Sequence, residues 1–132
     1  MTIDDLLIEL DESKRRFWFI QRSEIERTDE TIRLRLIINE ALFIQVFLSE
    51  ATGRFSLALI QGRERLYGRD REGDMWHLHP FSASETHRPT PEGVSPWPLL
   101  QFLAEVEELL FENELIWVQS LSFTRPDFRQ GN

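Results

Sequence analysis

The residues best suited to chemistry lie close together in the second half of the chain. All three histidines, His77, His79 and His87, fall between positions 77 and 87. Imidazole titrates near neutral pH, so a histidine can accept or donate a proton under physiological conditions. His77 and His79 are two positions apart in a segment that alternates like a β-strand. We therefore expect both rings on one face, about 6.5 Å apart.

The segment just upstream of the histidines is rich in arginine, with Arg71 closest to them. Cleavage of RNA needs a base for the 2′-hydroxyl, an acid for the leaving oxygen and cations around the phosphate. The histidines would supply the acid and the base, the arginines would bind phosphate, and a tyrosine would stack on a nucleobase. Alternation over residues 63–70 predicts that these ligand-binding residues share one face of a strand: Arg63, Arg65, Tyr67 and Arg69.

Two other interpretations of the histidines stay open. His77, His79 and His87 could hold a divalent metal, with Glu85 or Asp74 reaching in from the neighbouring loop or turn. No motif in the sequence requires a cofactor. Alternatively, His77 and His79 are structural and hydrogen-bond loop backbone at the end of a strand.

Hydrophobic residues alternate with a period of two over most of the chain up to His79. This alternation predicts six strands, in residues 17–27, 32–38, 42–48, 54–61, 63–70 and 75–79. The connections are too short for parallel crossovers, so the strands should form an antiparallel meander. In the third strand, Phe43 and Phe47 point away from the core row, which predicts that the second face of the sheet is covered as well.

Hydrophobic residues with helical spacing occur in the sequence both before and after this predicted sheet. Thr2 and the acidic residues after it suit the start of a short helix over residues 3–14, which we expect to cover an edge or an end of the sheet. Prolines in residues 80–96 predict a rigid loop. An apolar stripe predicts a second helix over residues 97–113, lying across the sheet with Glu105 in solvent. The whole chain, residues 1–132, is thus expected to form one α+β domain.

Composition and charge narrow the class of protein. The net charge of −8 argues against non-specific binding to nucleic acid or anionic membranes. Residues 31–71 differ, because they hold 7 basic and 4 acidic residues, a balance of +3. The absence of cysteine excludes a thiolate nucleophile and a cysteine-based zinc site. No signal peptide or transmembrane pattern is visible, so we expect a cytoplasmic protein that does not contact membranes.

One run of residues resembles a known family. Tyr67, Asp70, Gly73 and Trp76-His77-Leu78-His79-Pro80, followed by His87 and Glu92 and then by a Leu/Glu-rich helix, are similar to the TumE-like family of small prokaryotic proteins. That family groups toxin components of toxin–antitoxin pairs. The resemblance covers about residues 17–112 and implies a compact α+β fold, a site at the histidine-rich strand end and an antitoxin protein as partner. It supplies no established reaction or cofactor.

A non-enzymatic interaction module is the alternative function. Residues 115–123 alternate again, and we expect them to add a strand at the sheet edge or to leave an apolar patch for a second copy of the chain. The histidines would then be structural or metal-binding in a homodimer. The last residues, 124–132, are expected to be a frayed tail.

Overall fold

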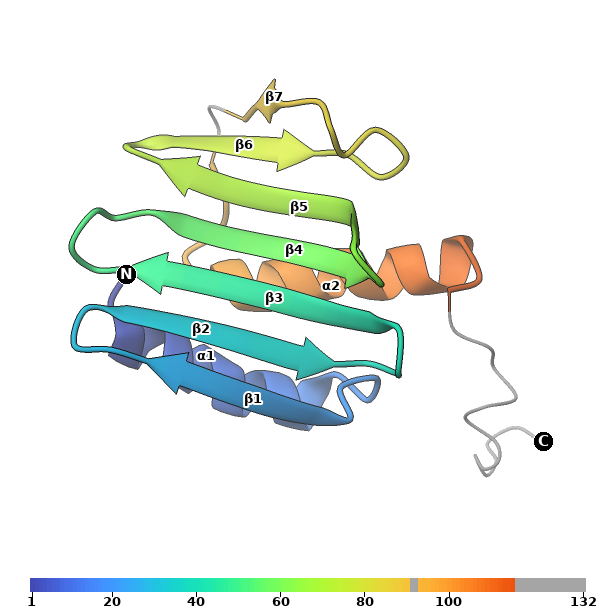
Figure 1. The fold of residues 1–132 in the computed structure, drawn as a ribbon, viewed down its shortest axis with the longest axis horizontal. Helices are drawn as coiled ribbons and strands as arrows, with labels where there is room; N and C mark the ends of the chain where they lie inside the picture. The colour runs from blue at the N-terminus through green and yellow to red at the C-terminus, as the bar shows by residue number, and fades with distance from the viewer. Residues whose placement is uncertain (91–92, 116–132) are drawn as a thin grey trace.

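The strands of this protein form a single antiparallel meander. The computed structural model describes residues 1–90 and 93–115. Within these residues, seven strands pair in sequence order, so each strand lies beside the next one along the chain (Figure 1). The predicted α+β class and antiparallel sheet are confirmed, with one more strand than expected. The elements are α1 (Ile3–Arg16), β1 (Arg22–Arg27), β2 (Thr31–Ile37), β3 (Leu42–Ser49), β4 (Phe55–Gln61), β5 (Glu64–Glu72), β6 (Met75–His79), β7 (Arg88–Pro89) and α2 (Pro98–Glu112).

Both helices cover the same face of the sheet. Figure 1 shows α1 behind β1 and β2, and α2 behind β3 and β4. The core fills the layer between them, with Leu6 and Leu10 of α1 and Phe102 of α2 fully or almost fully buried. Burying each such side chain contributes about 1.5–3 kcal/mol. The first helix, expected to cover an edge or an end of the sheet, lies behind the edge strand β1 and its neighbour β2, and its apolar stripe packs into the same core as α2.

A buried glutamate joins the two helices. Trp97, the residue before α2, provides no side-chain cap for that helix. Instead Glu9 of α1 accepts hydrogen bonds from the backbone N–H groups of Leu99 and Leu100, at 2.9 and 3.1 Å. Burial raises the pKa of Glu9 and outweighs these two donors, which lower it. Glu9 is thus an N-cap for α2 supplied by another helix, and its own charge is disfavoured there.

The link between α1 and the sheet differs from the predicted strand over residues 17–27. The helix continues to Arg16, and the sheet begins only at Arg22. Phe17 and Phe19 are buried between these elements, and the N–H of Phe17 closes the helix by donating to the carbonyl of Ser13. The alternation of residues 17–20 therefore comes from a turn that packs two aromatic rings, not from strand pairing.

The face of the sheet opposite the helices is here called the open face, and within residues 1–90 and 93–115 no helix covers it, contrary to the prediction of a covered second face. Neither helix lies on it (Figure 1). Phe43 and Phe47 of β3 are only half-buried there. The guanidinium carbons of Arg35 and Arg33, both on β2, lie 4.5 and 5.3 Å from the centres of these two rings. Arginine side chains thus shield the aromatic rings that a second layer was expected to cover.

The sheet ends in a short strand within residues 80–96, where the prolines had predicted only a rigid loop. Strand β7 has only two residues, and it pairs Pro89 with His77 and Arg88 with Leu78. A proline is tolerated there because β7 is an edge strand. Residues 116–123 of the expected C-terminal strand and the tail 124–132 lie outside the described residues. In the part of the chain that is described, no helix has the length and apolarity needed to cross a membrane.

Candidate functional site

His79 is the fixed centre of the site. Its side chain is 1% exposed, and both ring nitrogens are bonded. Nδ1 lies 2.9 Å from the carbonyl oxygen of Ser84, and Nε2 lies 3.0 Å from Oδ2 of Asp70. These two contacts fix the ring of His79 between the loop that carries Ser84 and strand β5, which carries Asp70.

The other two histidines gather around this pair. Oδ1 of Asp70 lies 3.9 Å from Nδ1 of His77, so one carboxylate stands between two imidazoles. The ring of His87 lies 4.3 Å from the ring of His79 and 6.0 Å from that of His77, centre to centre. His77 is 25% exposed and His87 is exposed. We call Asp70, His77, His79 and His87 the histidine cluster.

The hairpin of β5 and β6 explains why these residues meet. The chain turns at Gly73, which has a positive φ of 63° that glycine adopts without strain. The turn sets Asp70 directly opposite His77. His79, two residues further along β6, has its side chain on the same face. Asp70 was not predicted as a site residue, although counting back across the turn would have found it.

The loop after β6 folds back over the hairpin and carries His87. The carbonyl of Ser84 accepts from His79 and also from Nη2 of Arg65, at 3.2 Å. The hydroxyl of Ser84 donates to the carbonyl of Arg65. Ser84 therefore joins the loop to both β5 and β6. This contact was not predicted, because nothing in the sequence marks one serine in a polar loop.

A β-bulge separates the residues that were expected to share one face of β5. The register shifts between Leu59 and Ile60, so Tyr67 pairs with Leu59 whereas Arg65 pairs with Ile60. Leu59 is in the core and Ile60 is on the open face, so Arg65 and Tyr67 point to opposite sides of the sheet. Arg65 is on the same face as the histidine cluster and bonds to Ser84, which also bonds to His79. The prediction of a common face for Arg63, Arg65, Tyr67 and Arg69 is wrong.

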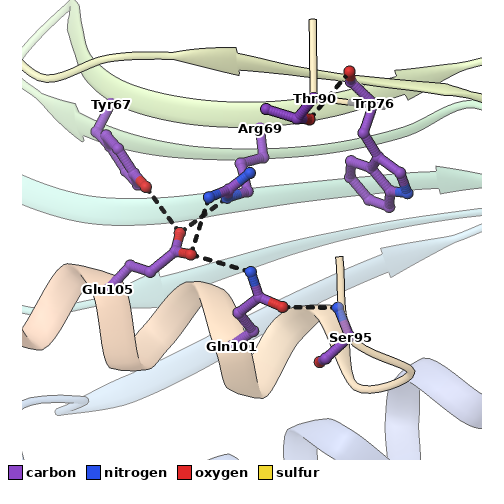
Figure 2. Close-up of polar contacts among 7 residues, drawn as sticks. All are labelled: Tyr67, Arg69, Trp76, Thr90, Ser95, Gln101 and Glu105. Atoms are coloured by element: carbon purple, nitrogen blue, oxygen red, sulfur yellow. Dashed lines mark hydrogen bonds and ion pairs between the residues drawn. The ribbon is translucent and has the colours of Figure 1, made fainter. Parts of the chain in front are cut away.

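Tyr67 and Arg69 instead face α2, where they meet Glu105 (Figure 2). The hydroxyl of Tyr67 donates to Oε1 of Glu105 at 2.7 Å. Arg69 donates to both carboxylate oxygens, at 2.9 and 3.0 Å. Gln101 of α2 adds a fourth hydrogen bond, to Oε2 of Glu105 at 3.0 Å. These four residues form the Glu105 brace, and the prediction that Glu105 stays in solvent is wrong.

The electrostatics of the Glu105 brace are those of a closed structural contact. Burial raises the pKa of Tyr67, and the Glu105 carboxylate raises it further. Burial lowers the pKa of Arg69, but the hydrogen bonds and charge of Glu105 reverse this and leave it raised. Tyr67 thus stays neutral and Arg69 stays charged at any physiological pH. Tyr67 and Arg69 were expected to bind a ligand, but they instead hold α2 against the sheet.

The other two arginines of the upstream segment also differ in their surroundings. Arg63 is exposed and precedes β5, which begins at Glu64. Arg71 donates twice to the carbonyl of Gly53, at 3.2 and 2.9 Å, and its guanidinium lies over the ring of Trp76. Arg65 is therefore the cation with a hydrogen bond to the loop that carries His87.

The metal-binding alternative gains no support from the geometry. Among residues 1–90 and 93–115, no group of three or more His, Cys, Asp or Glu side chains is arranged to hold a metal ion. His79 has both ring nitrogens engaged, so it cannot offer a lone pair without giving up a hydrogen bond. Its bond to Ser84 is the backbone contact that the structural interpretation expects.

Comparisons of this chain with protein-family models, curated proteins and solved structures find no match. The resemblance to the TumE-like family stays a prediction.

Proposed function

We propose that the histidine cluster cleaves or binds RNA at a phosphodiester, and that the protein is a TumE-like toxin component of a toxin–antitoxin pair. The observation that carries the proposal is the meeting of three imidazoles and one carboxylate on the open face. His79 is locked, whereas His77 and His87 are accessible. Two accessible imidazoles are what a proton-transfer reaction needs.

His77 and His87 would act as the base and the acid. His77 accepts the proton of the RNA 2′-hydroxyl, and the 2′-oxygen then bonds to phosphorus. The bond from phosphorus to the 5′-oxygen breaks, and a protonated His87 gives its proton to that oxygen. The products are a 2′,3′-cyclic phosphate and a 5′-hydroxyl, so no metal or other reactant is consumed. The two rings are 6.0 Å apart, close enough for both to reach one phosphodiester.

Asp70 and Arg65 would assist without exchanging protons. The Asp70 carboxylate, 3.9 Å from His77, stabilises the imidazolium that forms when His77 takes a proton. The Arg65 guanidinium has further N–H donors beyond the one bonded to Ser84, and these suit a phosphate oxygen. His79 is a positioning residue, because it holds Asp70 and the loop of His87 in register.

Growth of a bacterial host tests the toxin proposal. The protein is expressed from a tightly controlled promoter as wild type, as His77→Ala, as His87→Ala and as Glu85→Ala. Glu85 is exposed in the same loop, so its variant is the matched control. We expect arrest of growth with the wild type and the control, and normal growth with either histidine variant at equal soluble protein level. Normal growth with all four proteins would refute the toxin proposal.

A further inference from the structure

The open face of β2, β3 and β4 carries features that the acid–base chemistry does not use. It presents Phe43 and Phe47, with Arg35 and Arg33 stacked on them. Aromatic rings on an uncovered sheet, next to arginines, can stack on the bases of single-stranded nucleic acid. Residues 31–71, which form β2 to β5 with their turns, are also the segment with the balance of +3 in a chain of −8. The rings are on β3, which holds no charged residue, so the cations beside them are Arg33 and Arg35 of β2. In the register of the sheet these arginines pair with Glu26 and Glu24 of β1.

The register of the sheet aligns these rings with the histidine cluster. Phe47 pairs with Ser56, Ser56 with Asp70, and Asp70 with His77, so these residues form one row across the strands. With neighbouring strands about 4.8 Å apart, this row places Phe47 roughly 14 Å from His77. A parallel row joins Phe43 to Ile60 and Arg65. A strand laid across the sheet would pass from the rings to the proposed acid and base.

A hollow beside Phe43 supplies a place for a base at the far end of these rows. It has a volume of about 520 Å³, and Ile37 and Phe43 form its apolar wall. Its polar side chains are Gln21, Arg22, Glu24, Arg35, Asn39 and Glu40. The side-chain oxygen of Asn39 accepts from the backbone of Ala41 and Leu42, which leaves its amide nitrogen to donate to a ligand.

We infer that the open face binds single-stranded RNA, with bases stacked on Phe43 and Phe47 and phosphates beside Arg33 and Arg35. The inference rests on the proposed function, because it names the substrate class of the same site. Guanidinium groups lie over both half-buried rings, so a base would take the place of a guanidinium over each ring. Double-stranded RNA does not fit, because its bases are stacked inside the helix and cannot reach the rings.

Binding of an uncleavable RNA measures this site independently of catalysis. The probe is a fluorescent single-stranded 2′-O-methyl RNA, which has no 2′-hydroxyl, and the competitors are its duplex and the single-stranded DNA of the same sequence. We expect the wild-type protein to bind the single strand more tightly than the duplex. Phe43→Leu and Phe47→Leu should each raise the Kd about tenfold, because a stacking surface is lost. Phe111→Leu, at an exposed position on α2, is the control and should bind as the wild type does.

A second variant keeps the test decisive if a phenylalanine change disturbs the sheet. Arg33 and Arg35 are exposed, so Arg33→Ala/Arg35→Ala should fold normally. It should weaken binding and flatten its dependence on salt, because two phosphate contacts are lost. Equal Kd values for wild type, the two phenylalanine variants and the arginine variant, all folded, would overturn the inference.

The outcomes separate this inference from the proposed function. His77→Ala should still bind the 2′-O-methyl probe, with a smaller loss of affinity than either phenylalanine variant shows. Cleavage of natural RNA that does not depend on Phe43 or Phe47 would refute the open-face site alone. Binding that depends on both rings, in a protein that cleaves no RNA, would support the open-face site and refute the acid–base proposal. Preference for the duplex would refute the single-strand assignment.

Discussion

Strand β5 supplies charged residues to two regions that use them in opposite ways. On the helix side, Arg69 and Tyr67 share the Glu105 carboxylate under α2. On the open face, Asp70 stands between His77 and His79, and neither α1 nor α2 lies on that face. The first region is closed, and its carboxylate accepts hydrogen bonds from three side chains. The second keeps two imidazoles within reach of solvent. Both regions are built from charged and polar residues, so residue type does not distinguish them. The difference is that helix α2 covers the first region, which makes it a structural contact, and leaves the second accessible as a candidate site.

The largest expected effect is on catalysis at the open face. His77→Ala and His87→Ala should each slow RNA cleavage about 100- to 10,000-fold, because each removes one proton-transfer group. Neither side chain is buried, so the free energy of unfolding should change by less than about 1 kcal/mol. Cleavage assays and urea unfolding on the same samples measure both quantities. Full activity in either variant would remove that residue from the mechanism.

On the helix side, we expect a substitution to lower stability without lowering activity. Glu105→Ala leaves Arg69 and the Tyr67 hydroxyl without their shared acceptor, which should lower the free energy of unfolding by about 3 kcal/mol. Rates of cleavage by the folded variant should stay near those of the wild type. Glu108→Ala, at an exposed position of the same helix, is the matched control and should be neutral. Loss of activity without loss of stability in Glu105→Ala would break the comparison.

A smaller effect should come from Gly68, which lies between the two regions on β5. An added Cβ would stand 3.1 Å from the carbonyl of Leu57 and 3.3 Å from Cδ of Arg65. Gly68→Ala should therefore cost about 1–2 kcal/mol of stability and shift Arg65 from Ser84. Ser56→Ala, on the same face of β4, is the control. Unchanged stability and RNA affinity in Gly68→Ala would show that the sheet relaxes without moving Arg65.

The smallest expected effect concerns the pH dependence contributed by Glu9. Because burial raises its pKa, the folded protein favours the neutral carboxyl. That contribution to stability is fully present below the ordinary glutamate value of about 4.3 and is lost as pH rises through the higher folded-state pKa. Glu9→Gln stays neutral, so it should be more stable than the wild type at pH 7, by less than about 1 kcal/mol. Urea unfolding at pH 4 and pH 7 checks the sign, and a less stable variant at pH 7 would contradict it.

Much of the fold was readable from the sequence because alternation reports the buried row of each strand. Ile32, Leu34 and Leu36 are all in the core, as expected for β2. The bulge at β5 was not readable, because one extra residue leaves the composition unchanged and still moves every later side chain to the other face. Glu105 was misjudged for a related reason. Helical spacing places it at the rim of the apolar stripe, and only the position of Arg69 decides whether it is buried.

The site was predictable in part. Spacing alone brings His77 and His79 to one face, but the proximity of His87 depends on how the loop folds onto Ser84 and Arg65. The role of Asp70 depends on its pairing across the hairpin with His77. Such long-range contacts lie beyond what periodicity can report.

The central claim is that His77 and His87 act as base and acid on an RNA phosphodiester. A single-stranded DNA oligonucleotide containing one ribonucleotide tests it most directly, because only that position has a 2′-hydroxyl. Mass spectrometry of the products after incubation with purified protein and chelator should find a 2′,3′-cyclic phosphate at the ribonucleotide. The product should be missing with His77→Ala or His87→Ala. An intact oligonucleotide with the wild-type protein, or a cyclic phosphate formed equally by both variants, would contradict the account.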